Sequence, residues 1–199
     1  MKKLIFAGVL IAIVFASTRW ATNAVNGPPQ DVLLPTDTTL ALELSVEDMV
    51  SQSDVIAIGS CTETKSVWVD RSLVTLATVS VTENLKGSET SLTVALPGGV
   101  DANRKIPIAM TYPGAPRITP GENVLLFLTP SDEVAGSYTV AGFSQGKFSI
   151  VTDENGEQVV TRDLTKTSLQ GNNGVSRGHS NLTPLSSLKD QVRGYLKNR

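Results

Sequence analysis

About a hundred consecutive residues from Asp54 onward are dominated by β-branched and apolar side chains that recur with a period of two. This period places alternate residues on opposite faces of an extended strand. Clusters of Gly, Pro and Asn interrupt the pattern at short intervals, and no long helical segment separates one strand from the next. The chain therefore lacks the alternating strand–helix units of a parallel sheet, and we expect a mostly β, antiparallel fold.

The turn signals divide this region into strands. We expect strands at 54–69 (one long or bent strand), 73–82, 92–96 and 123–128, then one extended stretch made of 138–143 and 147–151, and a last strand at 158–162. Gly142 and Gly146 interrupt the extended stretch and indicate a bulge or bend there. Asn155-Gly156 predicts a hairpin with a type I′ turn, because these two residues tolerate positive φ.

Two helices flank the strands. Ser45 and Asp48 have the spacing of a capping box, and Leu44 can pack on Met49 as a hydrophobic staple, which predicts a helix from Val46 to about Ser53. Near the end of the chain, Thr183 can cap a helix over residues 184–197, with Pro184 at its first position. The apolar residues of this second helix recur at helical spacing, so we expect an amphipathic helix that docks on the sheet.

Five or six strands and two short helices predict a small antiparallel OB-like barrel, with a two-sheet β-sandwich as the alternative. The barrel domain is expected to span residues 45–199. An irregular tether precedes it at 25–44, a long Pro-rich connection lies at Val100 to Pro120, and the polar, Gly- and Asn-rich stretch 165–181 is expected to be a flexible loop.

Residues 1–24 have the pattern of a secretory signal peptide. Lys2 and Lys3 precede an uncharged apolar run of 13 residues, whereas a membrane-spanning helix needs roughly 20. Cleavage is expected after Ala24, or alternatively after Ala16, and the mature form would be periplasmic or secreted and would not span a membrane. Without the leader the chain has 14 basic and 19 acidic side chains, so its net charge of −5 argues against nucleic acid as a partner.

Neither a metal nor a cofactor is expected. Cys61 is the single cysteine, so no intrachain disulfide can form, and with one His the chain cannot supply a zinc site of Cys and His ligands. We interpret Cys61 as a small buried apolar residue. The acidic residues Asp132 with Glu133, and Asp153 with Glu154 and Glu157, lack the spacing of a calcium loop and are interpreted as solvated turn residues.

The sharpest catalytic motif is Gly142-Phe143-Ser144-Gln145-Gly146, which matches the G-x-S-x-G nucleophile elbow. In a serine hydrolase Ser144 would be the nucleophile, His179 the base and Asp163 or Asp153 the orienting acid. The context is unfavourable, because the elbow needs a helix after its turn and residues 147–151 are predicted to be a strand. His179 also falls in the segment expected to be least ordered.

Several segments share a pattern of turns and strands with a known group of proteins: residues 46–59, 79–87, 96–99, Pro116 with 120–122, 125–128 and 142–148. On these segments the chain resembles a group of uncharacterised exported bacterial proteins, over about residues 45–163 and more weakly over the last helix. The resemblance implies an OB-like barrel, more distantly similar to netrin and metalloproteinase-inhibitor barrels. Those inhibitors act through an amino-terminal Cys tied by disulfides, and this chain has neither, so their mechanism is not implied.

Three hypotheses about function remain. The first is an exported, non-enzymatic domain that binds a protein or envelope partner through the Pro-rich connection Val100 to Pro120 and neighbouring turns. The second is the hydrolase centred on Ser144, and the third is a protease inhibitor that uses an exposed loop. Among the aromatic residues, Trp68, Tyr112 and Phe143 are candidates for a binding surface, although packing at a sheet edge is the favoured interpretation for Trp68.

Overall fold

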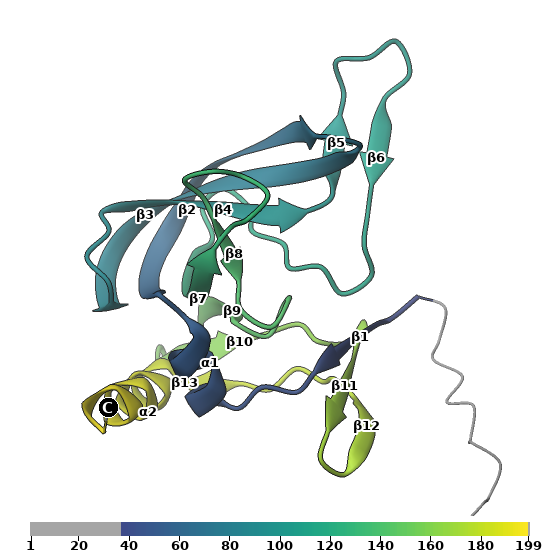
Figure 1. Ribbon diagram of the computed structural model, residues 1–199. Helices are drawn as coiled ribbons and strands as arrows, with labels where there is room; N and C mark the ends of the chain where they lie inside the picture. Colours follow the sequence, from purple (N-terminus) through teal and green to yellow (C-terminus); the bar gives the residue numbers. More distant parts are fainter. Residues whose placement is uncertain (1–36, 199) are drawn as a thin grey trace, which may run out of the picture. The chain divides into compact units, whose positions relative to one another are not determined.

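Five strands close into a ring in the computed structural model of the chain, which describes residues 37–198 (Figure 1). They are β2 (Val55–Val69), β3 (Ser72–Lys86), β4 (Ser91–Pro97), β8 (Tyr138–Val140) and β7 (Asn123–Pro130), in the order in which they pair. All neighbours are antiparallel except β4 and β8, which pair in parallel at Val94 and Tyr138. The predicted mostly β, OB-like architecture is confirmed in this closed, largely antiparallel ring.

Strand β7 and the first part of β2 bury both of their faces, which explains why Val124–Leu128 and Val55–Ile58 are apolar without interruption. In β7, Val124, Leu126 and Leu128 point into the ring, whereas Leu125 and Phe127 point outward. The outward cluster is covered by the two helices, α1 (Val46–Gln52) and α2 (Leu185–Lys197). The fold therefore has two apolar cores that share the same strands.

Beyond β7 the large sheet continues through β9 (Lys147–Thr152), β10 (Gln158–Thr161) and the short β13 (Thr183–Pro184). The β9–β10 hairpin is found where Asn155-Gly156 predicted it, but the turn is not type I′. Only Gly156 has a positive φ, of 83°, and its amide donates to the Asp153 carbonyl. This is a type I turn followed by a left-handed glycine, which Asp153 stabilises by accepting from the amides of Asn155 and Glu157.

A separate three-stranded sheet corrects two expectations. The segment 165–181, expected to be a flexible loop, contains the hairpin of β11 (Thr167–Gly171) and β12 (Gly174–Arg177). The segment 25–44, expected to be an irregular tether, contributes β1 (Thr39–Leu42), which pairs in parallel with β11. Backbone pairing orders this segment, and Thr167, Ser168 and Leu169 are buried in it. Its polar composition alone does not predict a buried core.

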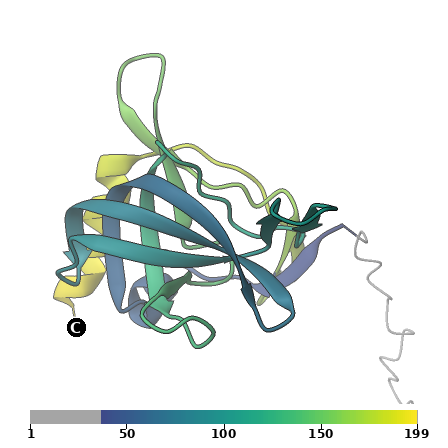
Figure 2. The same cartoon turned by 90° about the horizontal axis from the view of Figure 1, so that it is seen from above.

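The Pro-rich connection also contains regular structure. Its first half forms a hairpin of β5 (Gly99–Asp101) and β6 (Ile108–Met110), and its second half, 111–120, runs without regular structure to β7. Figures 1 and 2 both place the β5–β6 hairpin at the end of the domain opposite α2. In Figure 2 the long β2–β3 hairpin spans the distance between these two ends.

Both predicted helices are present in the structure. Ser45 and Asp48 form the predicted capping box of α1, with Ser45 Oγ accepting from the Asp48 amide at 3.1 Å and the Asp48 carboxylate from the Ser45 amide at 3.0 Å. The start of α2 differs in detail, because Pro184 is the cap residue and Thr183 belongs to β13. Pairing with β10 keeps Thr183 extended.

The turn Gly142–Gly146 joins β8 to β9 and anchors the amino-terminal segment. Gln145 is fully buried; its side-chain oxygen accepts from the Leu44 amide at 2.8 Å, and its side-chain nitrogen donates to the Leu42 carbonyl at 2.6 Å. Gly142 has a φ of 63°, and a Cβ there would lie 2.6 Å from the Leu44 side chain. The glycine motif is thus needed for the close packing of the segment between β1 and α1.

The predicted signal peptide, its cleavage positions and residues 25–36 of the expected tether lie outside the described residues. Residues 37–198 belong to one compact unit that comprises residues 34–199. None of the helices among the described residues combines the length and the apolar character needed to cross a bilayer.

Replacing Gln145 with Leu should destabilise the domain. The substitution removes the side-chain partner of the Leu44 amide and of the Leu42 carbonyl, so we expect the free energy of unfolding to fall by about 1–3 kcal/mol. Urea unfolding followed by circular dichroism measures the change. Gln158→Leu, at an exposed position of β10, is the control and should change stability by less than about 0.5 kcal/mol. Equal effects of the two substitutions would contradict the anchoring role of Gln145.

Candidate functional site

A polar groove lies between the second half of the Pro-rich connection and the strands β9 and β10. Its volume is about 690 Å³. Charged residues of both signs and six hydroxyl side chains line it, together with the backbone of residues 111–117. The charged residues are Asp37, Arg117, Glu122, Lys147, Asp163 and Lys166, and the hydroxyl residues are Thr111, Thr119, Ser144, Ser149, Thr161 and Ser180.

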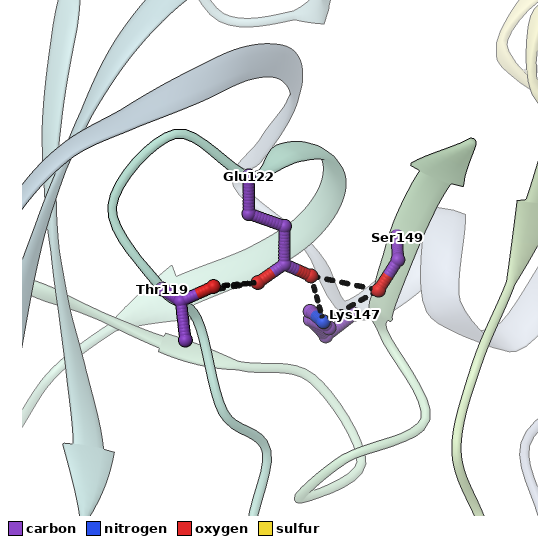
Figure 3. Close-up of polar contacts among 4 residues, drawn as sticks. All are labelled: Thr119, Glu122, Lys147 and Ser149. Carbon is purple, nitrogen blue, oxygen red and sulfur yellow. Dashed lines mark hydrogen bonds and ion pairs between the residues drawn. The ribbon is translucent and has the colours of Figure 1, made fainter. Parts of the chain in front are cut away.

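One wall of this groove is a hydrogen-bonded network centred on Glu122 (Figure 3). Lys147 Nζ donates to Glu122 Oε1 at 2.5 Å and to Ser149 Oγ at 2.7 Å, and Ser149 Oγ donates to the same carboxylate oxygen at 2.7 Å. The other carboxylate oxygen accepts from the Thr119 amide at 3.0 Å. The network ties the start of β7 to β9 and to the end of the Pro-rich connection.

The protonation states of this network follow from its geometry. Burial acts to raise the pKa of Glu122, but the hydrogen bonds from Lys147, Ser149 and the Thr119 amide outweigh it and lower this pKa below its usual value. Glu122 is therefore a carboxylate at neutral pH, and its Oε1 accepts from both Lys147 Nζ and Ser149 Oγ.

The structure brings together two of the three predicted hydrolase residues. Ser144 and Asp163 line the same groove, whereas His179 is exposed and is not among the described residues that border it. The side chain of Ser144 is buried, and its Oγ lies 3.4 Å from Thr167 Oγ1. Strand β9 begins at Lys147, directly after the glycine motif, where a nucleophile elbow would continue into a helix.

Asp163, the predicted orienting acid, binds Thr165, two residues further along the chain. Its carboxylate accepts from the hydroxyl of Thr165 at 2.6 Å and from the Thr165 amide at 3.0 Å. These bonds, together with the charges of Lys147 and Lys166, lower the pKa of Asp163. Asp153, the alternative acid, is bound to the amides of its own hairpin turn.

A second, more apolar cavity of about 400 Å³ lies on the other side of the Pro-rich connection. Tyr112, Ala115, Pro116 and Arg117 line both cavities. The segment is held between them by Ile118, which is 4% exposed and packs into the core inside the ring. Burying an Ile side chain contributes about 1.5–3 kcal/mol, which is enough to fix this segment to the ring.

The remaining candidates from the sequence lie apart from the groove or at its rim. Trp68 is 37% exposed on β2, next to the β5–β6 hairpin, and Tyr112 is 43% exposed. Phe143 is half-buried in the glycine turn, with a φ of 66°.

Cys61 is buried as expected, and burial raises the pKa of its thiol. Among residues 37–198 no three His, Cys, Asp or Glu side chains are grouped as metal ligands.

The Glu122 network was missed by the reasoning from sequence. Lys147 and Ser149 stand two residues apart on a predicted strand and therefore on one face, and this signal was present. Their partner Glu122 lies directly before β7, and the antiparallel pairing of β7 with β9 brings it close. Comparisons with protein-family models and with curated proteins found no match for this chain.

The Glu122 network should make stability depend on pH. The folded-state pKa of Glu122 is lowered, so its contribution is present above the usual value of 4.5 and is lost as the pH falls through the folded-state value. We expect Glu122→Gln to reduce the free energy of unfolding by about 1–2 kcal/mol at neutral pH. The difference from the wild type should shrink toward pH 3, as urea unfolding at several pH values would reveal. Glu157→Gln, in the exposed hairpin turn, is the control, and a loss independent of pH would contradict the ionic role.

The buried Ser144 should not react as a nucleophile. We expect no labelling by a fluorophosphonate probe, because Ser144 is buried and the side-chain partner of its hydroxyl is the Thr167 hydroxyl rather than a base. A known serine hydrolase in the same tube is the positive control and should be labelled. Gel fluorescence and mass spectrometry would detect the adduct. Labelling that disappears in Ser144→Ala would instead establish the hydrolase hypothesis.

Proposed function

We propose that this chain is an exported, non-enzymatic binding domain that contacts a protein or envelope partner through the Pro-rich connection 100–120. One observation carries the proposal: the second half of this connection borders both cavities while Ile118 fixes it to the ring. A segment that is anchored by the buried Pro116 and Ile118 and has exposed residues on both sides of them presents a pre-formed surface. Binding to such a surface costs less conformational entropy than binding to a mobile loop.

The chemistry of the groove supports recognition of a polar, extended ligand. Its serine and threonine hydroxyl groups can both donate and accept hydrogen bonds, as a polypeptide segment requires. Arg117 is exposed and makes no hydrogen bond or ion pair with other described residues, so its charge is available to a ligand. Tyr112 beside it supplies an aromatic surface of the kind enriched at interfaces.

The location of the protein is part of the same proposal. The predicted leader 1–24, with cleavage after Ala24, would release the domain into the periplasm or the medium. The net charge of −5 without the leader favours a partner other than nucleic acid.

The double variant Tyr112→Ala/Arg117→Ala should lose the partner. Both side chains are exposed at the shared border of the two cavities, so their removal should weaken binding by at least about tenfold with little effect on folding. The measurement is affinity capture from envelope and secreted fractions, quantified by mass spectrometry against the wild type.

The matched control for that capture is Arg177→Ala/Leu182→Ala, which removes an arginine and a large apolar residue at exposed positions of β12 and of the segment before β13. The control should retain every protein that the wild type captures. Identical sets of captured proteins for the wild type and for the Tyr112/Arg117 variant would refute the proposed surface.

A further inference from the structure

The β2–β3 and β5–β6 hairpins meet at the end of the domain opposite α2 (Figure 1). Trp68 is one of the residues that join them. Trp68 lies near the end of β2, and its indole nitrogen donates to Asp101 Oδ2 on the β5–β6 hairpin at 2.8 Å. The Arg104 guanidinium lies over the Trp68 ring, 4.9 Å from its centroid. We call the residues 65–71 and 99–107 the hairpin-tip surface.

Arg104 is held in a defined orientation on this surface. Its Nε donates to Asp101 Oδ2 at 2.8 Å, and the ring of Trp68 supports its guanidinium plane. The hydrogen bonds from Trp68 and from Arg104 lower the pKa of Asp101, so this carboxylate stays ionised. The side chain of Arg104 is nevertheless 53% exposed.

The outer edge of Arg104 is therefore available for recognition. Its two terminal nitrogens make no hydrogen bond or ion pair with other residues in the part of the chain that the structure describes. A planar pair of donors with a fixed orientation matches the two oxygens of a carboxylate. Because Trp68 and Asp101 already restrict the side chain, binding a carboxylate there costs less rotamer entropy than at a mobile arginine.

The charge around Arg104 favours an acidic ligand. The hairpin-tip surface contains four basic and two acidic side chains, whereas the rest of residues 37–198 contains nine basic and sixteen acidic ones. Large apolar side chains accompany the charges, since Val100 is 55% and Ile106 is 77% exposed. Exposed apolar groups beside a pre-oriented arginine are typical of the energetic centre of protein interfaces.

We propose that the hairpin-tip surface binds an acidic segment of a partner protein, with Arg104 holding one of its carboxylates and Val100 and Ile106 contacting its apolar side chains. This inference rests on the proposed binding function and names the chemistry of the partner. A long polyanion such as a nucleic acid, or an anionic membrane, is less compatible with the acidic remainder of the domain, which would repel it.

The test uses the full chain and a fluorescein-labelled short peptide of Glu and Asp interspersed with Leu and Val, measured by fluorescence anisotropy. Binding should weaken about tenfold when NaCl rises from about 0.05 to about 0.5 M, because surface ion pairs are screened by salt. It should weaken by at least about tenfold in Arg104→Gln and less in Arg104→Lys, which keeps the charge without the planar pair of donors. The matched control Arg177→Gln, at an exposed arginine of β12, should bind as the wild type does.

Two further measurements distinguish a loss of charge from a loss of the fold, and the acidic peptide from other anionic ligands. Arg71→Glu/Lys105→Glu reverses two exposed charges that make no side-chain contacts among the described residues, so it should abolish binding and leave urea unfolding unchanged. A peptide with Gln and Asn in place of Glu and Asp, single-stranded DNA and anionic phosphatidylglycerol vesicles should all bind more weakly than the acidic peptide. Tighter binding of DNA or vesicles, or wild-type affinity in Arg104→Gln, would overturn the inference.

The outcome is distinguishable from failure of the proposed function itself. If the acidic peptide does not bind while the Tyr112/Arg117 variant still loses captured partners, the partner is not acidic and only the present inference fails. If partner capture is unaffected by that variant, the proposed surface fails independently of the peptide result.

Discussion

The burial of β7 on both faces is the constraint on which the rest of the structure depends. Its odd and even side chains belong to different cores, one inside the ring and one beneath the helices. The strand therefore has to be covered twice, by the closed ring on one side and by α1 and α2 on the other. The ring interior also accepts Ile118, so the Pro-rich connection is fixed by the same core that closes the ring.

The glycine motif 142–146 illustrates how a sequence pattern associated with catalysis can arise from packing. Gly142 and Gly146 are small because Leu44 and Phe127 approach them closely, and Gln145 is polar because it pairs with backbone groups of the amino-terminal segment. Ser144 fills a buried position in this turn. The two glycines and Gln145 thus have structural reasons that are independent of the reaction chemistry of an elbow.

Sequence reasoning succeeded where the determining contacts are local. The capping box of α1 joins residues three apart, and the β9–β10 hairpin is set by its own turn. It failed where ordering comes from distant partners. The polar hairpin β11–β12 is ordered by pairing with β1, which lies more than a hundred residues earlier in the chain. The alternating Leu40, Leu42 and Leu44 indicate a strand in the segment that was expected to be irregular. The Glu122 network joins the segment before β7 to β9 and could not be predicted for the same reason.

The electrostatics of the domain connect these observations to function. In the groove, Lys147 forms an ion pair with Glu122, and this pair fixes the wall of the groove. On the hairpin-tip surface, Asp101 uses one edge of Arg104 and leaves the other edge open. A paired charge of the first kind stabilises a scaffold, whereas a charge that is oriented but only half satisfied gains energy from a ligand of opposite charge. In the binding function proposed above, the Glu122–Lys147 pair belongs to the scaffold and Arg104 to the contact surface.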